Sequence, residues 1–267
     1  MQELTDQELQ GFSRLMAEAA GISLPGSKKA LVGSRLARRL QAMGCASYAQ
    51  YLELLRRDAA ERQRAVDLLT TNETYFFREP GHFAYLAERI VPAAESSRPL
   101  RVWSAACSSG EEPYSIAMTV LETLPHPGSW DVRILATDLD SEVLERARRG
   151  VYPLERTASL SAQRRERFFT EHRDGRTVSH RIAPEVASLV TFKQLNLMHP
   201  LPMKGPLDVV FCRNVIIYFD KDTQRDLFTR ICRLQRPGDL LLLGHSESLF
   251  KVCESYGLIG KTIYRRL

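Results

Sequence analysis

Several short β-rich runs of this sequence end in side chains that could bind a cofactor. The run Leu100–Trp103 is followed by the small residues 104–110 and then by Glu111 and Glu112. Small residues between a strand and a helix let a ligand approach the backbone, and the helix start offers free amide groups. Two carboxylates at that helix start would repel a pyrophosphate but not an amino group. The pattern therefore favours a cofactor with an amino group and no phosphate over a nicotinamide dinucleotide.

The later strand ends are polar as well. Asp138 follows the run 132–137 and could accept hydrogen bonds from both hydroxyls of a ribose, whereas Asp140 can equally cap the next helix. A solvated turn carboxylate is the plain alternative for Asp138. Asn196 and Leu197 offer an amide and an apolar face for an adenine. Beyond the next run lie three further candidates, Arg213, Asn214 and Tyr218. Because ligands of open α/β sheets bind outside the carboxyl ends of the strands, we expect these residues to meet in one crevice.

An alternation of β-rich and helical runs must position these residues, and it is typical of a parallel sheet with crossover helices. The predicted strands are 100–103, 132–137, 189–192, 207–211 and 240–243, with an edge hairpin at 256–259 and 262–264, and the predicted helices are 111–124, 141–149 and 222–234. The long, basic interval 152–184 carries the turn signal Asp174-Gly175. We expect a small antiparallel β insertion there, at about 168–192.

The residues before this alternation indicate helices only. Their apolar side chains recur at helical spacing in the segments 6–20, 25–43, 47–57 and 58–69, with Thr5 or Asp6 and Ser47 as helix caps. The predicted fold is therefore α/β with two domains. An all-α domain occupies 1–72, a linker and first helix occupy 73–99, and a Rossmann-like sheet domain occupies 100–267.

Composition narrows the class of protein. The chain has 267 residues, of which 44% are hydrophobic and 26% charged, and this excludes disordered, collagen-like and coiled-coil classes. No apolar run reaches the roughly 18 residues needed to span a bilayer, and the start lacks an export signal, so we expect a cytoplasmic protein without membrane insertion. Five widely spaced cysteines and six histidines without ligand spacing predict neither a disulfide framework nor a metal site. The net charge of +5 is compatible with nucleic acid, with an acidic protein or with neither.

Four stretches carry a family resemblance that extends over nearly the whole chain. They are 71–79 (TNETYFFRE), 103–115 (WSAACSSGEEPYS), 211–219 (FCRNVIIYF) and 244–248 (GHSES). They resemble the signature blocks of the bacterial chemotaxis receptor methyltransferases, the CheR family. The resemblance implies a class I S-adenosylmethionine-dependent methyltransferase sheet preceded by an all-α domain. It also implies methylation of glutamate side chains on chemoreceptors for adaptation in chemotaxis, with S-adenosylhomocysteine as the other product.

The resemblance assigns roles to individual residues. It implies a cofactor site formed by Asn72, Thr74, Arg78, Glu111, Asp138, Asn196, Leu197, Arg213 and Asn214. Within that site, Glu111 would hold the methionine amino group and Asp138 the ribose. Tyr218 would lie near the transferred methyl group, and Arg78 and Tyr218 are the candidate catalytic residues. A glutamate with a pKa of about 4.3 is already ionised at neutral pH, so no general base is expected.

A basic face on the second predicted helix gives the excess charge a location. No acidic residue lies between Pro25 and Met43. Basic residues within about a third of the helix circumference are Lys28, Arg35, Arg38 and Arg39. A solvated face is the plain interpretation, whereas the resemblance favours docking on the acidic helices of a receptor. Some family members also bind a C-terminal receptor peptide on the small insertion, and residues 173–182 leave this open. We expect a monomer.

Two alternatives come from other functional classes. A nucleic-acid methyltransferase would agree with the basic charge, but the chain lacks an Asn-Pro-Pro-Tyr type loop after the fourth strand and lacks interleaved basic and aromatic residues. A methyltransferase-like adaptor without catalysis is the other alternative. Intact polar residues at the strand ends favour an enzyme over such an adaptor.

Overall fold

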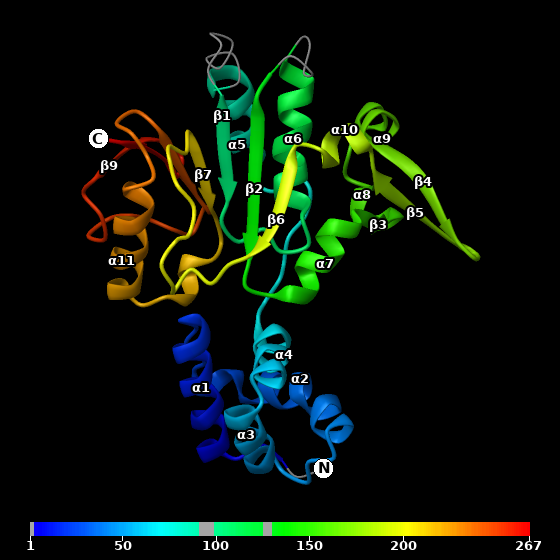
Figure 1. The fold of residues 1–267 in the computed structure, drawn as a ribbon, viewed down its shortest axis with the longest axis vertical. Helices are drawn as coiled ribbons and strands as arrows, with labels where there is room; N and C mark the ends of the chain where they lie inside the picture. The colour runs from blue at the N-terminus through cyan, green and yellow to red at the C-terminus, as the bar shows by residue number, and fades with distance from the viewer. Residues whose placement is uncertain (1–2, 91–98, 125–129) are drawn as a thin grey trace.

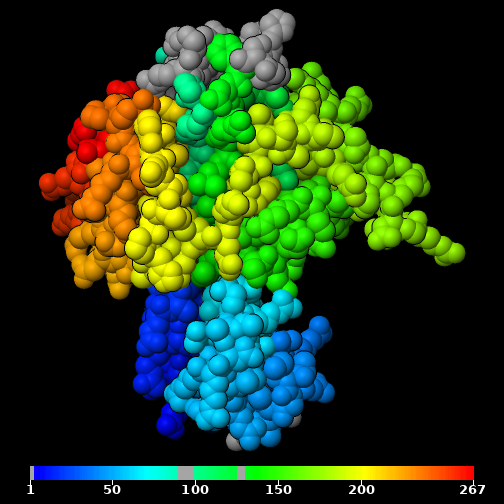
Figure 2. All heavy atoms as spheres, in the orientation of Figure 1, coloured from blue at the N-terminus to red at the C-terminus, as the bar shows by residue number. Residues whose placement is uncertain are grey.

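The computed structural model describes residues 3–90, 99–124 and 130–267. Residues 91–98 of the predicted linker and first helix, and residues 1–2 of the predicted all-α domain, lie outside the described residues. The described part forms an all-α unit and a sheet domain, which meet across a narrow waist (Figures 1 and 2). Within the described ranges, no helix is long and apolar enough to cross a membrane.

The first unit consists of packed helices, as predicted. Its elements are α1 Asp6–Ala20, a 3₁₀ turn Gly26–Lys28, α2 Lys29–Ala42, α3 Tyr48–Arg57 and α4 Ala59–Leu69. Local signals set the ends of α1, because Thr5 begins it with a reciprocal capping box and Gly21, at a φ of 68°, ends it. The helices turn their apolar faces inward and bury a common core that includes Phe12, Leu36 and Tyr51.

A mainly parallel sheet forms the centre of the second unit. The described strands are β1 Leu100–Ser104, β2 Val132–Asp138, β6 Val190–Gln194, β7 Val209–Cys212, β8 Leu240–Leu243, β9 Tyr256–Gly260 and β10 Ile263–Arg266. Their order in the sheet is β6-β2-β1-β7-β8-β10-β9. Strands β1, β2, β6, β7 and β8 pair in parallel, whereas β10 runs antiparallel to β8 and β9. The predicted parallel sheet with an edge hairpin is confirmed.

Helices cover both faces of this sheet (Figure 1). The larger connecting elements are α5 Pro80–Tyr85 with a π turn at Leu86–Ile90, α6 Glu111–Thr123, α7 Ser141–Arg149 and α11 Lys221–Cys232. Successive residues of β1 point to opposite faces, so Val102 belongs to one buried apolar cluster and Trp103 to another. The chain first builds β1, β2 and β6 toward one edge and then places β7 on the other side of β1. A switch of this kind opens a crevice at the carboxyl ends of the two central strands.

A small antiparallel sheet projects from the main body between α7 and β6 (Figure 1). Its elements are β3 Val151–Pro153, α8 Leu154–Thr157, α9 Ala162–Phe168, β4 Phe169–Asp174 and β5 Thr177–Ile182, and α10 Pro184–Ala187 follows. Gly175, at a φ of 56°, makes the turn between β4 and β5. The predicted extent of 168–192 differs from the structure at both ends. Strand β3 pairs with β5 and extends the unit back to Val151, while residues 190–192 belong to β6 of the main sheet.

Candidate cofactor and active site

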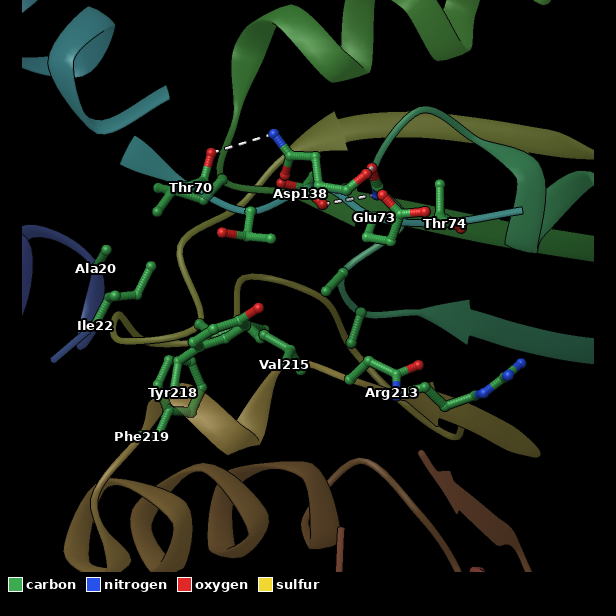
Figure 3. A pocket seen from close by; sticks show the side chains of 18 of the residues that line it. Ala20, Ile22, Thr70, Glu73, Thr74, Asp138, Arg213, Val215, Tyr218 and Phe219 are labelled. Atoms are coloured by element: carbon green, nitrogen blue, oxygen red, sulfur yellow. Dashed lines mark hydrogen bonds between the residues drawn. The ribbon is translucent and has the colours of Figure 1, made fainter. Parts of the chain in front are cut away.

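A cavity lies where the all-α unit meets the carboxyl ends of the strands. The sheet domain contributes residues that end or follow β1, β2, β6 and β7, and the helical unit contributes the ends of α1 and α4 and the start of α2. Predicted residues that line it are Asn72, Thr74, Arg78, Asp138, Asn196, Leu197, Arg213, Asn214 and Tyr218. Figure 3 shows one wall with Thr70, Glu73 and Asp138, and the facing wall with Val215, Tyr218 and Phe219. The expected crevice is therefore present, and the helical unit closes one side of it.

Asp138 is held by main-chain donors at the end of β2. Its Oδ2 atom accepts a hydrogen bond from the Ser108 amide at 2.8 Å, and its Oδ1 atom accepts one from the Asp140 amide at 3.0 Å. Burial raises the pKa of Asp138 to about 6, even though these amides lower it. Among the described residues, no cationic side chain forms a salt bridge with this carboxylate. A buried acceptor without a positive partner suits the hydroxyl donors of a ribose.

Arg213 lies between two carboxylates next to the cavity. Its side chain is only 1% exposed, and its NH2 atom is 3.1 Å from the Oε2 atom of Glu79. Its NH1 atom is 3.3 Å from the Oε2 atom of Glu112. Burial would raise the pKa of Glu79, but the His245 amide and the Arg213 charge hold that pKa below its usual value. The protein itself therefore neutralises Arg213, which fixes the position of Glu112.

The adjacent glutamates at the start of α6 point to different places. Glu112 lines the cavity and accepts a hydrogen bond from the Ser104 hydroxyl at 2.6 Å. Glu111 is fully buried, accepts from the Ser109 hydroxyl at 2.7 Å and lies 3.9 Å from the Nε atom of Arg156 in α8. Burial raises the pKa of both carboxyl groups. Of these two adjacent glutamates, Glu112 therefore lines the cavity and Glu111 does not.

Two asparagines of the site are held by internal contacts. The Asn196 amide nitrogen donates to the carbonyl oxygen of Ala19 at 2.6 Å, and its Oδ1 atom accepts from the Met198 amide at 2.9 Å. Asn196 therefore joins the sheet domain to α1 as well as lining the cavity. Asn214 has a φ of 57°, and its backbone N–H donates to the Oε2 atom of Glu247 at 2.7 Å. Glu247 lies in the GHSES block and was not predicted as a site residue.

The candidate catalytic residues lie in segments without long helices or strands. Arg78 donates from its NH1 atom to the carbonyl oxygen of Glu73 at 2.8 Å, and its guanidinium is 5.8 Å from the ring centre of Tyr75. Tyr218 ends the 3₁₀ turn Ile216–Tyr218. In the described part of the chain, the Tyr218 hydroxyl has no hydrogen-bond partner. This hydroxyl is therefore free to contact a ligand in the cavity.

The four predicted docking residues do not share one environment. Arg35 donates to the carbonyl oxygen of Leu69, the last residue of α4, at 3.0 Å and to that of Thr70 at 2.7 Å. Arg39 forms a salt bridge with Glu61 of α4. Arg38 is exposed and has no ion-pair partner within the described ranges, and Lys28 is exposed and lines the cavity. Two of the four therefore hold the helical unit together, and two face outward.

One cluster offers three potential metal ligands. The ligand atoms of Glu79, His82 and His245 lie within 4.8 Å of one another. Burial lowers the pKa of His82 to about 4, with Arg213 adding to the effect, so its ring is neutral at physiological pH. Arg213 already supplies the positive charge at Glu79, and a divalent ion would lie beside that buried guanidinium. We therefore assign no metal to this cluster.

Fold and site together define a class of protein. The sheet has its switch point between β1 and β7, its first crossover helix begins with acidic residues, and a buried carboxylate ends β2. This is the organisation of a class I S-adenosylmethionine-dependent methyltransferase, in which a Rossmann-like sheet binds a cofactor that has no phosphate.

Comparison with known proteins identifies the family. The model of the CheR methyltransferase SAM binding domain matches residues 72–265, and the model of the CheR methyltransferase all-alpha domain matches residues 7–70. The chain therefore belongs to the CheR methyltransferase family, and its sheet domain is an S-adenosylmethionine-binding domain.

Curated relatives resemble the chain over nearly their full length. Chemotaxis protein methyltransferase 2 of Pseudomonas aeruginosa is 44% identical over 97% of this chain and 93% of the relative. The chemotaxis protein methyltransferases of Salmonella typhimurium and Escherichia coli are each 42% identical over 98% of this chain, covering 90% and 91% of those proteins. A solved structure of TrmN from Thermus thermophilus matches with a TM-score of 0.38 and 18% identity over 67% of this chain and 46% of that one, too distant to support an inference.

Proposed function

We propose that this protein transfers the methyl group of S-adenosylmethionine to glutamate side chains of bacterial chemoreceptors and forms methyl esters, which makes it a protein-glutamate O-methyltransferase. The observation that carries this proposal is the joint lining of one cavity by the S-adenosylmethionine-binding domain and the all-α domain of the family. The relatives named chemotaxis protein methyltransferase support the substrate class.

The cavity fits a cofactor with a positive charge and hydroxyl groups. S-adenosylmethionine supplies a methyl group activated by attachment to a sulfonium cation. In our proposal Glu112 accepts the amino group of the methionine portion, and Asp138 accepts the ribose hydroxyls. Buried carboxylates in the lining favour such a ligand, because its positive charges reduce the cost of keeping these groups ionised.

The acceptor requires little chemical activation. A glutamate side chain has a reference pKa of about 4.3 and is a carboxylate nucleophile at neutral pH. Correspondingly, no histidine or cysteine is found among the described residues that line the cavity. Positioning and exclusion of water then supply the rate enhancement. We assign the alignment of the acceptor carboxylate to the free hydroxyl of Tyr218, and contact with the carboxylate of the cofactor to Arg78.

Positive charge near the cavity supports an anionic protein substrate. Lys28 reaches the lining from the all-α domain, and Arg38 is exposed on α2 of the same domain. We propose that these two residues, rather than Arg35 and Arg39, contact the acidic helices of the receptor. Opposite charges at an interface speed the encounter and fix the orientation of the partners.

A methyl-transfer assay tests the reaction and the substrate together. Two reactions are run in parallel, each with the protein and labelled S-adenosylmethionine. One contains receptor-bearing membranes and the other contains nucleic acid. Label on receptor protein that is released as methanol at alkaline pH is the expected result, because glutamyl methyl esters are base-labile. Base-stable label, or label on nucleic acid alone, would contradict the proposal, and binding of the cofactor without transfer would indicate an adaptor.

A further inference from the structure

Asp140 connects the cofactor cavity to the segment that joins the two domains. It is the N-cap of α7, where its Oδ1 atom accepts hydrogen bonds from the amides of Glu142 at 2.9 Å and Val143 at 3.2 Å. Its Oδ2 atom accepts from the Asn72 side-chain amide at 2.6 Å and lies 3.1 Å from the Thr70 hydroxyl. One oxygen thus caps a helix of the sheet domain, and the other holds the interdomain segment.

These contacts belong to a closed ring of hydrogen bonds. The Ser108 hydroxyl donates to the Asn72 carbonyl oxygen at 3.0 Å. The amides of Ser108 and Asp140 donate to the two carboxylate oxygens of Asp138 at 2.8 and 3.0 Å. The bond from Asn72 to Asp140 closes the ring. Asn72, Ser108 and Asp138 line the cavity, whereas Asp140 is 2% exposed and stands behind it.

The positions of two ring members depend on these bonds. Asn72 lies on a segment without regular secondary structure, so neighbouring helix or strand contacts do not fix its place. Ser108 adopts a φ of 47°, a left-handed conformation that costs a residue with a side chain some free energy. Hydrogen bonds to a carboxylate are roughly twice as strong as those between neutral groups. The Asp140 carboxylate is therefore suited to hold Asn72 against the cavity.

We propose that Asp140 is a positioning residue for the cofactor, and that it acts by holding Asn72 in the cavity wall. The inference rests on the proposed function only in taking this cavity as the S-adenosylmethionine site. The segment that joins the two domains is then part of the cofactor site, and a residue of the sheet domain, Asp140, fixes the position of that segment.

Asp140→Asn tests the proposal with little change in shape. Asparagine is as good an N-cap as aspartate, so its side-chain oxygen keeps α7 capped. Its amide nitrogen then faces the amide nitrogen of Asn72, so the charge-assisted bond is lost and Asn72 can bond again only by turning its side-chain amide over. We expect the dissociation constant for S-adenosylhomocysteine, measured by calorimetry on the whole chain, to rise about tenfold, which corresponds to about 1.4 kcal/mol.

Two further variants separate positioning from capping. Asp220 caps α11 by accepting from the Thr223 amide at 2.8 Å and lies outside the cavity lining, so Asp220→Asn should leave the dissociation constant unchanged. In an Asn72→Ala background, Asp140→Asn should change affinity by less than about twofold, because the route through Asn72 is already lost. If Asp140→Asn lowers affinity tenfold in both the wild-type and the Asn72→Ala chain, Asp140 does not act through Asn72.

Ser108→Ala opens the ring at the opposite side without touching a buried charge. We expect it to raise the dissociation constant about threefold, and this variant decides the question if Asp140→Asn does not fold. Unchanged affinity in either folded variant overturns the proposal. A wild-type chain that does not bind S-adenosylhomocysteine would instead contradict the proposed function, so the two failures are distinguishable.

Discussion

Arg39 binds the Glu61 carboxylate with two nitrogen atoms, and its Nε atom is 2.8 Å from Glu61 Oε1. The Glu61 side chain is 3% exposed and also accepts a hydrogen bond from the Tyr51 hydroxyl at 2.6 Å. The contact joins α2 to α4 inside the all-α unit. Arg39, for which the family resemblance favoured a role in docking, therefore supports the fold of its own domain.

Removal of this pair should destabilise the protein. Arg39→Ala leaves a buried carboxylate without its cation, and we expect the free energy of unfolding in urea to fall by about 2–3 kcal/mol. The Arg39 contact lowers the pKa of Glu61 against the effect of burial, so the pair stabilises the fold above the unfolded pKa of about 4.3, and this stabilisation is lost as the pH falls through the folded pKa. Arg38→Ala, at an exposed position, should change stability by less than about 0.5 kcal/mol.

Charge reversal at Arg38 tests receptor docking without disturbing a buried contact. We expect Arg38→Glu to raise the KM for receptor about fivefold at low ionic strength, and the effect should shrink as salt screens the charges. Affinity for S-adenosylhomocysteine should stay at the wild-type value. A parallel loss of cofactor affinity would mean that Arg38 does not act in docking.

The two glutamates of α6 can be told apart by their neutral analogues. Glu112→Gln should weaken S-adenosylmethionine binding about tenfold, because Glu112 lines the cavity and is, in the proposed function, the charged acceptor for the amino group. Glu111→Gln should change the affinity by less than about twofold, since Glu111 is buried beside α8. Both affinities are measured by calorimetry. A larger loss for Glu111→Gln than for Glu112→Gln would indicate that Glu111 binds the amino group.

Cofactor affinity should depend on pH through Asp138, whose pKa is raised to about 6 by burial. In the proposed function the ionised carboxylate accepts ribose hydroxyls, so affinity for S-adenosylhomocysteine should fall by up to about tenfold per unit below pH 6 and be constant above pH 7. A raised pKa also means that the folded state binds this proton more tightly than the unfolded state. The contribution of Asp138 to stability therefore decreases as the pH rises from about 3.9 to 6. Asp138→Asn should remove both dependences, and an unchanged affinity profile would exclude Asp138 as their cause.

Tyr218→Phe should separate turnover from binding. Loss of the free hydroxyl should lower kcat for receptor methylation at least about tenfold, because the acceptor carboxylate loses an aligning donor. The thermal midpoint of unfolding and the affinity for S-adenosylhomocysteine should remain close to wild type. Methyl-ester formation at the wild-type rate would remove Tyr218 from the mechanism. Arg78→Ala should lower kcat/KM more than stability, through a higher KM for S-adenosylmethionine.

The features that could be predicted from sequence are those set by local patterns. Parallel strands read as short β-rich runs, and the polar residue after each run marks the edge where ligands bind, so Asp138, Asn196 and Arg213 were placed in one cavity in advance. Helix caps such as Ser47 can also be predicted from sequence, because capping depends on neighbours within one turn.

The features that escaped prediction depend on contacts between distant segments. Adjacent residues on a helix differ by 100° in direction, so only the rotation of α6 against the sheet decides which of Glu111 and Glu112 lines the cavity. Arg39 looked like part of a solvated face because its partner Glu61 is contributed by another helix. Strand β3 is too short to show an alternating pattern, and only its pairing with β5 reveals it.

Because Ala20 and Ile22 of the helical unit complete the cavity wall, the cavity has a boundary that the sheet domain alone cannot provide. A ligand of this cavity that extends toward these two side chains would gain apolar contacts supplied by the all-α domain. Medicinal chemistry could use this wall to separate members of the family from methyltransferases that share only the sheet.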